Sequence, residues 1–126
     1  MAQDIQKDTE LKVKKRHKII TTAYDNKGVK ICTTVNDYNK SHPLQKKLSL
    51  SVGLSEERAF LHSEIRCLLK SSSLRRKVNT LRVERYDSEG NPKIAFPCPS
   101  CRQGIKLAGV KRVVFTTENG YDEWII

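Results

Sequence analysis

The sequence has no long apolar run and few aromatic residues. No stretch approaches the roughly 20 apolar residues that a transmembrane helix requires, and residues 1–4 lack the basic-then-apolar pattern of a signal peptide. We therefore expect a cytoplasmic protein with no membrane partner. Aromatic residues make up only 6% of the chain, which leaves few side chains that could stack on nucleic-acid bases.

Acidic residues are also scarce. The chain has 14 Asp and Glu against 24 Lys and Arg, a formal net charge of +10. Such an excess favours a polyanionic partner, because each phosphate that is neutralised releases counterions. A basic protein whose charges are simply solvated is the alternative. Four cysteines in a cytoplasmic chain indicate metal binding or catalysis before disulfides.

The length and the pattern of apolar residues predict one α/β domain that spans residues 1–126. Residues 1–17 form either a leading helix or a flexible basic arm. Alternating or β-branched apolar residues predict strands at 18–25, 29–35, 80–86 and 111–117. Helical spacing or helix-start residues predict helices at 62–70 and 99–108, a helix start at 55–57 and one helical turn around 44–48.

The order of these elements predicts the topology of the sheet. The first two strands form a hairpin, because Asp25-Asn26-Lys27-Gly28 is typical of a turn. The later strand–helix–strand unit implies parallel strands joined by a right-handed crossover. We therefore expect a mixed sheet sandwiched by helices, followed by an acidic tail after residue 117.

Two short motifs carry the chemistry: His62-Ser63-Glu64, and Cys98-Pro99-Ser100-Cys101 after Pro97. Each begins a predicted helix, and a helix N-terminus favours the thiolate form of cysteine. One His and two Cys supply three ligands for zinc, which leaves a fourth position for water, as in catalytic sites. Glu64 lies two residues after His62, so it can face the same cavity and move protons without binding the metal.

The pattern H-x-E followed by P-C-x-x-C resembles that of the zinc-dependent deaminases. Residues 18–117 are similar to the cytidine deaminase-like superfamily, above all to its small phage and bacterial members. The resemblance implies a three-layer fold, a Zn²⁺ cofactor, and hydrolytic conversion of cytosine to uracil with Glu64 as the catalytic acid and base. A structural zinc site is the alternative, but it usually requires four ligands, and we expect Cys32 and Cys67 to pack in the core.

The resemblance also implies substrate contacts, each with a structural alternative. Asn36 would contact the sugar or base, or else serve as a turn residue. The backbone carbonyl of Ser63 would face the exocyclic amine. His42 would flank the substrate or shape its loop, and Phe96 and Tyr38 would stack on the base or pack in the core.

Two basic clusters could contact a phosphate backbone: Lys14, Lys15 and Arg16, and Arg75, Arg76 and Lys77. They favour cytosine in single-stranded DNA or RNA as the substrate. The alternative is free cytidine, deoxycytidine or their monophosphates. A non-catalytic, zinc-containing nucleic-acid-binding module is a third hypothesis, although it would not need Glu64. The sequence Ala95-Phe96-Pro97-Cys98 departs from the Ser/Thr-x-Ser-Pro-Cys run of the vertebrate polynucleotide deaminases. No feature predicts the oligomeric state.

Overall fold

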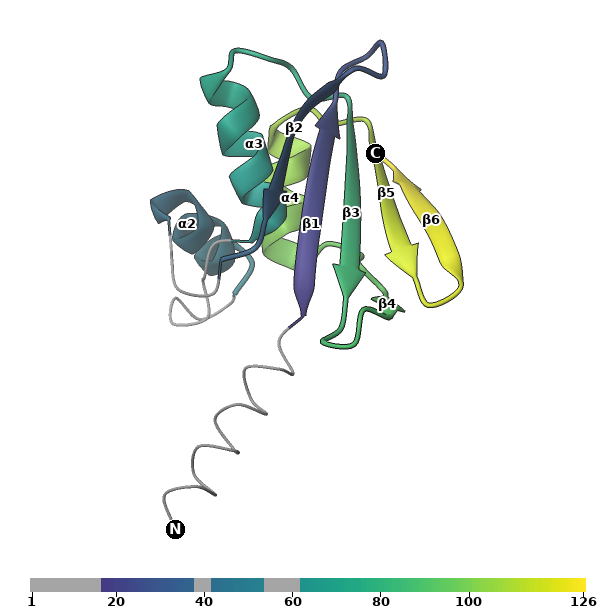
Figure 1. Cartoon of the computed structure of the whole chain (residues 1–126). Helices are drawn as coiled ribbons and strands as arrows, with labels where there is room; N and C mark the ends of the chain where they lie inside the picture. Colours follow the sequence, from purple (N-terminus) through teal and green to yellow (C-terminus); the bar gives the residue numbers. More distant parts are fainter. Residues whose placement is uncertain (1–16, 38–41, 54–61) are drawn as a thin grey trace.

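The computed structural model describes residues 17–37, 42–53 and 62–126, which form a mixed sheet with its helices on one side (Figure 1). The elements, in chain order, are β1 Lys18–Tyr24, β2 Lys30–Val35, α2 Pro43–Ser51, α3 Ser63–Ser73, β3 Thr80–Tyr86, β4 Pro92–Lys93, α4 Pro99–Leu107, β5 Arg112–Thr117 and β6 Gly120–Ile125. The predicted leading helix or basic arm at 1–17 lies outside the described residues except for residue 17. The predicted helix start at 55–57 also lies outside them.

The strand order is β2-β1-β3-β5-β6, and the short β4 pairs with β3. Strands β3 and β5 are parallel, with Leu81 opposite Val113, whereas the other pairs are antiparallel. The predicted α/β class, the opening hairpin and the parallel crossover are therefore confirmed. Because α4 connects β3 to β5, it begins at the end of the sheet where both strands finish.

The hairpin forms where its turn residues satisfy the backbone locally. Oδ1 of Asp25 accepts hydrogen bonds of 2.9 Å from the backbone N–H groups of Lys27 and Val29. Gly28 has a φ of 77°, a conformation that a residue with a Cβ rarely adopts. These contacts reverse the chain and set β1 against β2.

The core lies between the sheet and the helices α3 and α4. Alternate residues of the central strands face the helices, and Leu81, Val83 and Val113 are fully buried there. Gly104 allows α4 to approach its neighbours, because a Cβ at this position would lie 2.7 Å from Cδ1 of Ile65. The predicted core cysteines are also confirmed: Cys32 and Cys67 are buried, with their Sγ atoms 3.6 Å apart.

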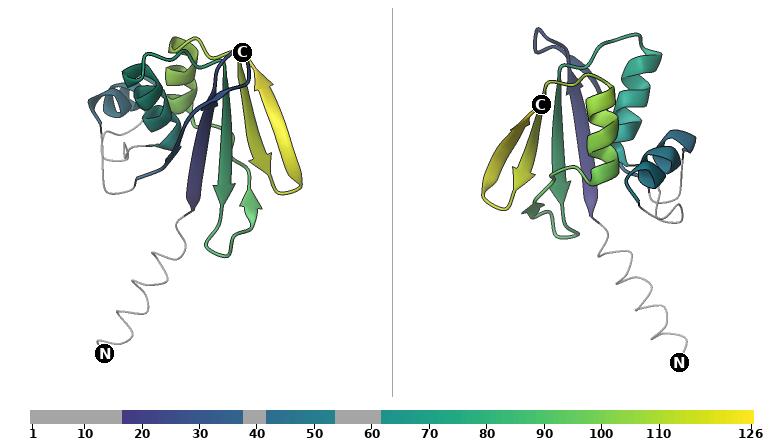
Figure 2. Two further views of the ribbon diagram at one scale, coloured as in Figure 1. Left: turned by 45° about the horizontal axis from the view of Figure 1, so that its top comes forward. Right: turned by 180° about the vertical axis from the view of Figure 1, so that it is seen from behind.

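Helices α3 and α4 cover the same face of the sheet (Figure 2), and α2 packs against α4. The described helices α3 and α4 therefore form one layer on the sheet. The face away from the helices carries polar side chains that contact one another. Glu84 accepts hydrogen bonds from Arg82 at 3.1 Å and from Tyr86 at 2.9 Å. Such a surface can face water without an apolar cover.

Two elements differ from the sequence prediction. The single helical turn expected around 44–48 is the nine-residue helix α2, which begins at Pro43 with His42 as its N-cap. The acidic tail is strand β6, which pairs with β5 along its whole length. Trp124 lies opposite Val113 and packs against the core, and this burial gives the polar segment its place in the sheet.

Among the described residues, no helix has the length and apolar character needed to cross a membrane.

Candidate metal centre

The two predicted motifs meet at the end of the sheet where β3 and β5 finish. His62 is the N-cap of α3, Cys98 is the N-cap of α4, and Cys101 lies in the first turn of α4. Pro99 occupies the start of α4, where its fixed φ suits a helix and its missing N–H costs nothing. Ligand sites in α/β sheets commonly lie outside the carboxyl ends of parallel strands.

The three predicted ligands come together in space. One ligand atom from each of His62, Cys98 and Cys101 lies within 4.8 Å of the others. Nδ1 of His62 is 3.6 Å from Sγ of Cys98 and 3.2 Å from Sγ of Cys101. One imidazole nitrogen and two sulfurs are donors that zinc prefers, and three protein ligands leave a position for water. The donor set therefore fits a catalytic zinc ion.

Burial and hydrogen bonding give the two cysteines different protonation behaviour. A hydrogen bond from Cys101 is the main reason why the pKa of Cys98 is lowered to about 3. The same bond, together with burial, raises the pKa of Cys101 well above its ordinary value. Burial lowers the pKa of His62, but the bond and charge of Cys98 outweigh it and the net direction is upward. Because zinc binds cysteine as the thiolate, metal binding to both sulfurs releases the proton of any ligand that is still a thiol.

Glu64 lies in the first turn of α3 with only 4% of its surface exposed. Its Oε1 accepts a hydrogen bond of 2.9 Å from Oγ of Ser63. Burial is the main reason why the pKa of Glu64 is raised. The predicted catalytic carboxyl group is therefore enclosed beside the metal ligands and fixed in orientation.

Two threonines that the sequence analysis did not single out fix Ser63. Oγ1 of Thr21, on β1, lies 2.7 Å from Oγ of Ser63. Oγ1 of Thr34, on β2, donates a hydrogen bond of 2.8 Å to the backbone carbonyl of Ser63. That carbonyl was expected to face the exocyclic amine of a substrate, and a carbonyl oxygen can accept a second hydrogen bond. The hairpin therefore positions the start of α3 directly.

Gln45 connects the two metal-binding motifs and was also missed. Its side chain is fully buried. Oε1 accepts from the backbone N–H of His62 at 3.4 Å, and Nε2 donates to Oγ of Ser100 at 3.2 Å. Oγ of Ser100 in turn lies 3.1 Å from Sγ of Cys98. A glutamine in a segment that reads as polar loop gives no sequence signal for this role.

Two predicted substrate contacts have local structural partners. Oδ1 of Asn36 accepts a hydrogen bond of 3.0 Å from the backbone N–H of Ile19, and its Nδ2 donates to the carbonyl of His17 at 3.4 Å. Nδ1 of His42 accepts from the N–H of Leu44 at 3.0 Å and caps α2. His42 therefore fulfils its structural alternative. Asn36 is not a turn residue, because it extends the pairing of β2 with β1, and the contacts of both residues with a substrate stay predictions.

Of the two predicted stacking residues, Tyr38 lies outside the described residues. Phe96 directly precedes the second motif and is 41% exposed. Its ring makes edge contacts with Phe115 and Trp124, at centroid distances of 5.3 and 5.6 Å. The guanidinium of Arg102 lies 5.1 Å from the ring centroid. Phe96 therefore packs against protein neighbours at the surface and not in the core, and its stacking on a base stays a prediction.

Those predicted nucleic-acid contacts that the structure describes do not surround the metal cluster. Lys14, Lys15 and Arg16 lie outside the described residues. Arg75, Arg76 and Lys77 follow the C-terminal end of α3, whereas His62 precedes its N-terminal end. With a rise of about 1.5 Å per residue, this helix of 11 residues separates the two groups by about 16 Å. The basic cluster is therefore remote from the metal site.

Comparison with known proteins agrees with the geometry. Residues 1–117 match the family model described as the cytidine and deoxycytidylate deaminase zinc-binding region. A search of curated proteins found no match. The matched region contains the His62, Cys98 and Cys101 cluster and the adjacent Glu64. The chain belongs to the cytidine and deoxycytidylate deaminase zinc-binding family and is a zinc-dependent deaminase.

Proposed function

We propose that the protein converts cytosine to uracil in single-stranded nucleic acid by hydrolytic deamination. The buried Glu64 beside a three-ligand zinc site supports the chemistry. The net charge of +10 supports a polynucleotide substrate, because the phosphate of one nucleotide requires only one or two cations.

The reaction exchanges an amine for an oxygen at one ring carbon. Water supplies the oxygen, a carbon–oxygen bond forms, the carbon–nitrogen bond breaks, and the amine leaves as ammonia. His62, Cys98 and Cys101 would hold the zinc ion, and the ion would supply a Lewis acid that lowers the pKa of water. Glu64 takes a proton from the attacking water and returns a proton to the leaving amine.

The residues around Glu64 explain how this proton transfer is oriented. The bond from Ser63 to Oε1 fixes the carboxyl group, and Thr21 fixes the hydroxyl of Ser63. Because these groups are buried, the carboxyl group does not need to reorganise a shell of water when its charge changes. Catalysis by a positioned acid and base typically contributes about 10²–10⁴-fold.

A second candidate is a deaminase of free cytidine, deoxycytidine or their monophosphates. One observation favours it: the described basic cluster Arg75–Lys77 lies about 16 Å from the metal ligands along α3. A short substrate in the zinc site would not reach this cluster. Under this alternative, most of the positive charge has no role in catalysis.

Deamination of two substrates in parallel distinguishes these candidates. Zinc-loaded protein is incubated with deoxycytidine monophosphate or with a long single-stranded oligonucleotide that contains cytosine, and uracil and ammonia are measured. We expect turnover of the oligonucleotide. Turnover of the monophosphate alone would contradict the proposed substrate.

Glu64→Gln, which keeps the size of the side chain, is the matched control for this experiment. We expect it to retain zinc and the fold while turnover falls by about 10²–10⁴-fold. Unchanged turnover would mean that the product does not arise in this site. Loss of zinc in this variant would instead show that Glu64 has a structural role.

A further inference from the structure

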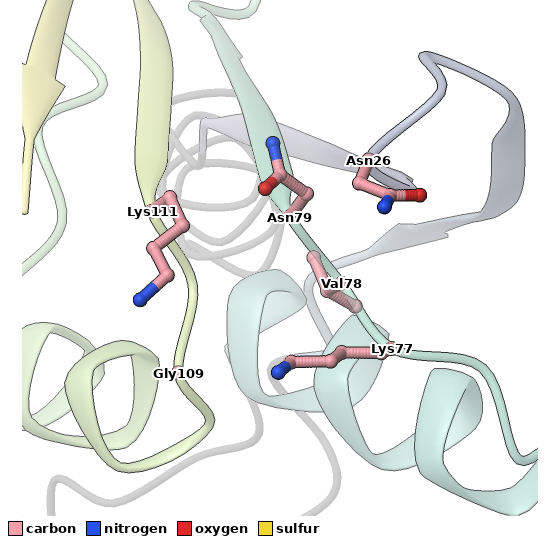
Figure 3. Close-up of a pocket in the computed structure, with 6 residues that line it drawn as sticks. All are labelled: Asn26, Lys77, Val78, Asn79, Gly109 and Lys111. Atoms are coloured by element: carbon pink, nitrogen blue, oxygen red, sulfur yellow. The ribbon is translucent and has the colours of Figure 1, made fainter.

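The end of the molecule opposite the metal ligands carries a second recessed surface. It is formed by the segment after α3, the starts of β3 and β5, and the β1–β2 turn. One hollow of about 260 Å³ is lined by Asn26, Lys77, Val78, Asn79, Gly109 and Lys111 (Figure 3). A second, of about 380 Å³, shares Lys77 and Val78 with the first and extends along Arg75 and Arg76.

The charges of this surface are of one sign. Among the described residues, neither hollow has an acidic lining residue. The nearest carboxylate that pairs with the lining is Asp25, whose Oδ2 lies 3.0 Å from Nη2 of Arg76. This ion pair offsets only one of the cations. Arg75, Lys77 and Lys111 are exposed and add charge that Asp25 does not neutralise.

The polar groups that line the first hollow are hydrogen-bond donors suited to phosphate. Lys77 and Lys111 come from two different segments. In Figure 3 the side chain of Lys77 reaches toward the gap between these segments, whereas that of Lys111 runs beside its own segment, on the side away from Lys77. Asn26 adds a side-chain amide at the same opening, and so does Asn79, whose Nδ2 also donates to Oγ1 of Thr80 at 3.1 Å. Amides and ammonium groups are the usual contacts of phosphate oxygens. No aromatic side chain is among the described lining residues, so the surface does not offer a platform for bases.

The backbone at Arg75 determines where this side chain lies on the surface. Arg75 has a φ of 55° and is the one non-glycine residue with a positive φ in the described ranges. It follows the C-cap of α3 at Leu74, a place where helices commonly end with glycine. A residue with a Cβ is strained in this conformation, and such strain is frequent at functional sites. The N–H groups of Arg75 and Arg76 donate to the carbonyls of Ser72 at 2.9 Å and of Ser71 at 3.0 Å, so this conformation ends the helix and leaves the side chain of Arg75 exposed beside the second hollow.

We propose that this surface, formed by Arg75, Lys77, Lys111, Asn26 and Asn79, binds the phosphate backbone of single-stranded nucleic acid outside the active site. The inference rests on the proposed polynucleotide substrate. A strand with one base in the zinc site can reach this surface only if it continues along the molecule, past the length of α3. The surface thus favours long strands over short ones and leaves the chemistry at the zinc site unchanged.

Binding measured with a catalytically inactive variant tests the proposed surface separately from deamination. The full chain carrying Glu64→Ala is titrated with a labelled long single-stranded oligonucleotide over a series of salt concentrations. Added to this background, Lys77→Glu with Lys111→Glu should weaken binding at least about tenfold. The slope of log K against log salt should become shallower by about 1.4, or about 0.7 for each lost phosphate contact.

The matched control is Lys18→Glu with Lys47→Glu, which changes the net charge equally at exposed residues outside both hollows. We expect a much smaller loss. Equal losses in the two double variants would mean that binding follows net charge, and the proposed surface would be rejected. Equally effective displacement of the oligonucleotide by polyglutamate of matched charge would also reject it, in favour of an acidic protein partner.

Turnover then separates the failure of this inference from the failure of the proposed function. With Glu64 intact, Lys77→Glu with Lys111→Glu should leave deamination of a cytosine-containing trinucleotide unchanged and raise the KM for the long strand. Binding that depends on the surface, without deamination of any oligonucleotide, would overturn the proposed function and leave the surface established. If both substitutions left the rate of deamination of long strands unchanged, the proposed surface alone would be rejected.

Discussion

The two ends of helix α3 differ in how their functional groups are arranged. At the N-terminal end, His62 and Glu64 lie within a network of buried side chains that includes Gln45 and Ser63. At the C-terminal end, the residues that follow the helix are exposed, and Arg75 contributes a charged side chain from a strained backbone. The first end is built for fixed geometry, and we propose that the second presents charge to a flexible partner.

This difference follows from the chemistry that each end performs or is proposed to perform. A metal ion and a proton-transfer group require atoms placed within a fraction of an ångström, which only packing and hydrogen bonds provide. A phosphate backbone is bound mainly by long-range attraction, and exposed lysines and arginines suffice for it. Substitutions at the N-terminal end should therefore alter metal affinity and rate, and those at the C-terminal end should alter salt-dependent binding.

The largest expected effect is the loss of a metal ligand. His62→Ala removes the only nitrogen donor of the described cluster. We expect zinc to be lost from the purified protein and deamination to fall to background, because two thiolates alone do not complete the site. Zinc content by atomic emission, measured beside turnover, checks this. Oligonucleotide binding at the other end should persist if the fold is kept, and retained zinc with full activity would contradict the assignment.

A smaller effect is expected from Gln45, which connects the backbone of His62 to Ser100. Gln45→Leu keeps the approximate volume but removes both hydrogen bonds. Loss of groups that orient metal ligands typically lowers metal affinity by about 10–100-fold. Competition with a chelator of known affinity measures this change. We expect Gln45→Glu, which retains an acceptor for the N–H of His62, to recover part of the affinity.

The control for Gln45 lies on the same helix. Leu48 is buried with 4% exposure, and the polar contacts between α2 and the metal ligands do not involve its side chain. Leu48→Ala should lower the free energy of unfolding by about 2–5 kcal/mol while zinc affinity stays close to that of the unmodified protein. If both variants lose zinc in proportion to their loss of stability, Gln45 supports the fold and does not position the ligands.

The metal ligands could be predicted from the sequence because their spacing is itself the signal. His62 and Glu64 share one helix start, and Cys98 and Cys101 share another. The strands of the hairpin and of the parallel unit were also predicted, because alternating or β-branched residues fix both their faces and their extent. These features depend on residues close together in the chain.

The parts that were missed depend on contacts between distant residues. Gln45 and Ser100 are 55 positions apart, and Thr21 and Ser63 are 42 positions apart. Strand β6 is polar along most of its length and becomes a strand because β5 offers it an edge. The remoteness of Lys77 from His62, in contrast, follows from the length of α3 and could be inferred from the predicted helix.

The smallest expected effect comes from Arg75. Substitutions at this residue separate the contribution of its charge to binding from the contribution of its backbone conformation to stability. Arg75→Gly relieves the strain of a positive φ at a cost in unfolded-state entropy, so stability should rise by at most about 1 kcal/mol. Oligonucleotide binding should nevertheless weaken, with the salt slope shallower by about 0.7. Arg75→Lys keeps both the charge and the strain, so it should keep the binding. If Arg75→Gly lowered the melting temperature and left binding intact, the arginine would serve the fold, and the contrast between the two ends of α3 would not extend to this residue.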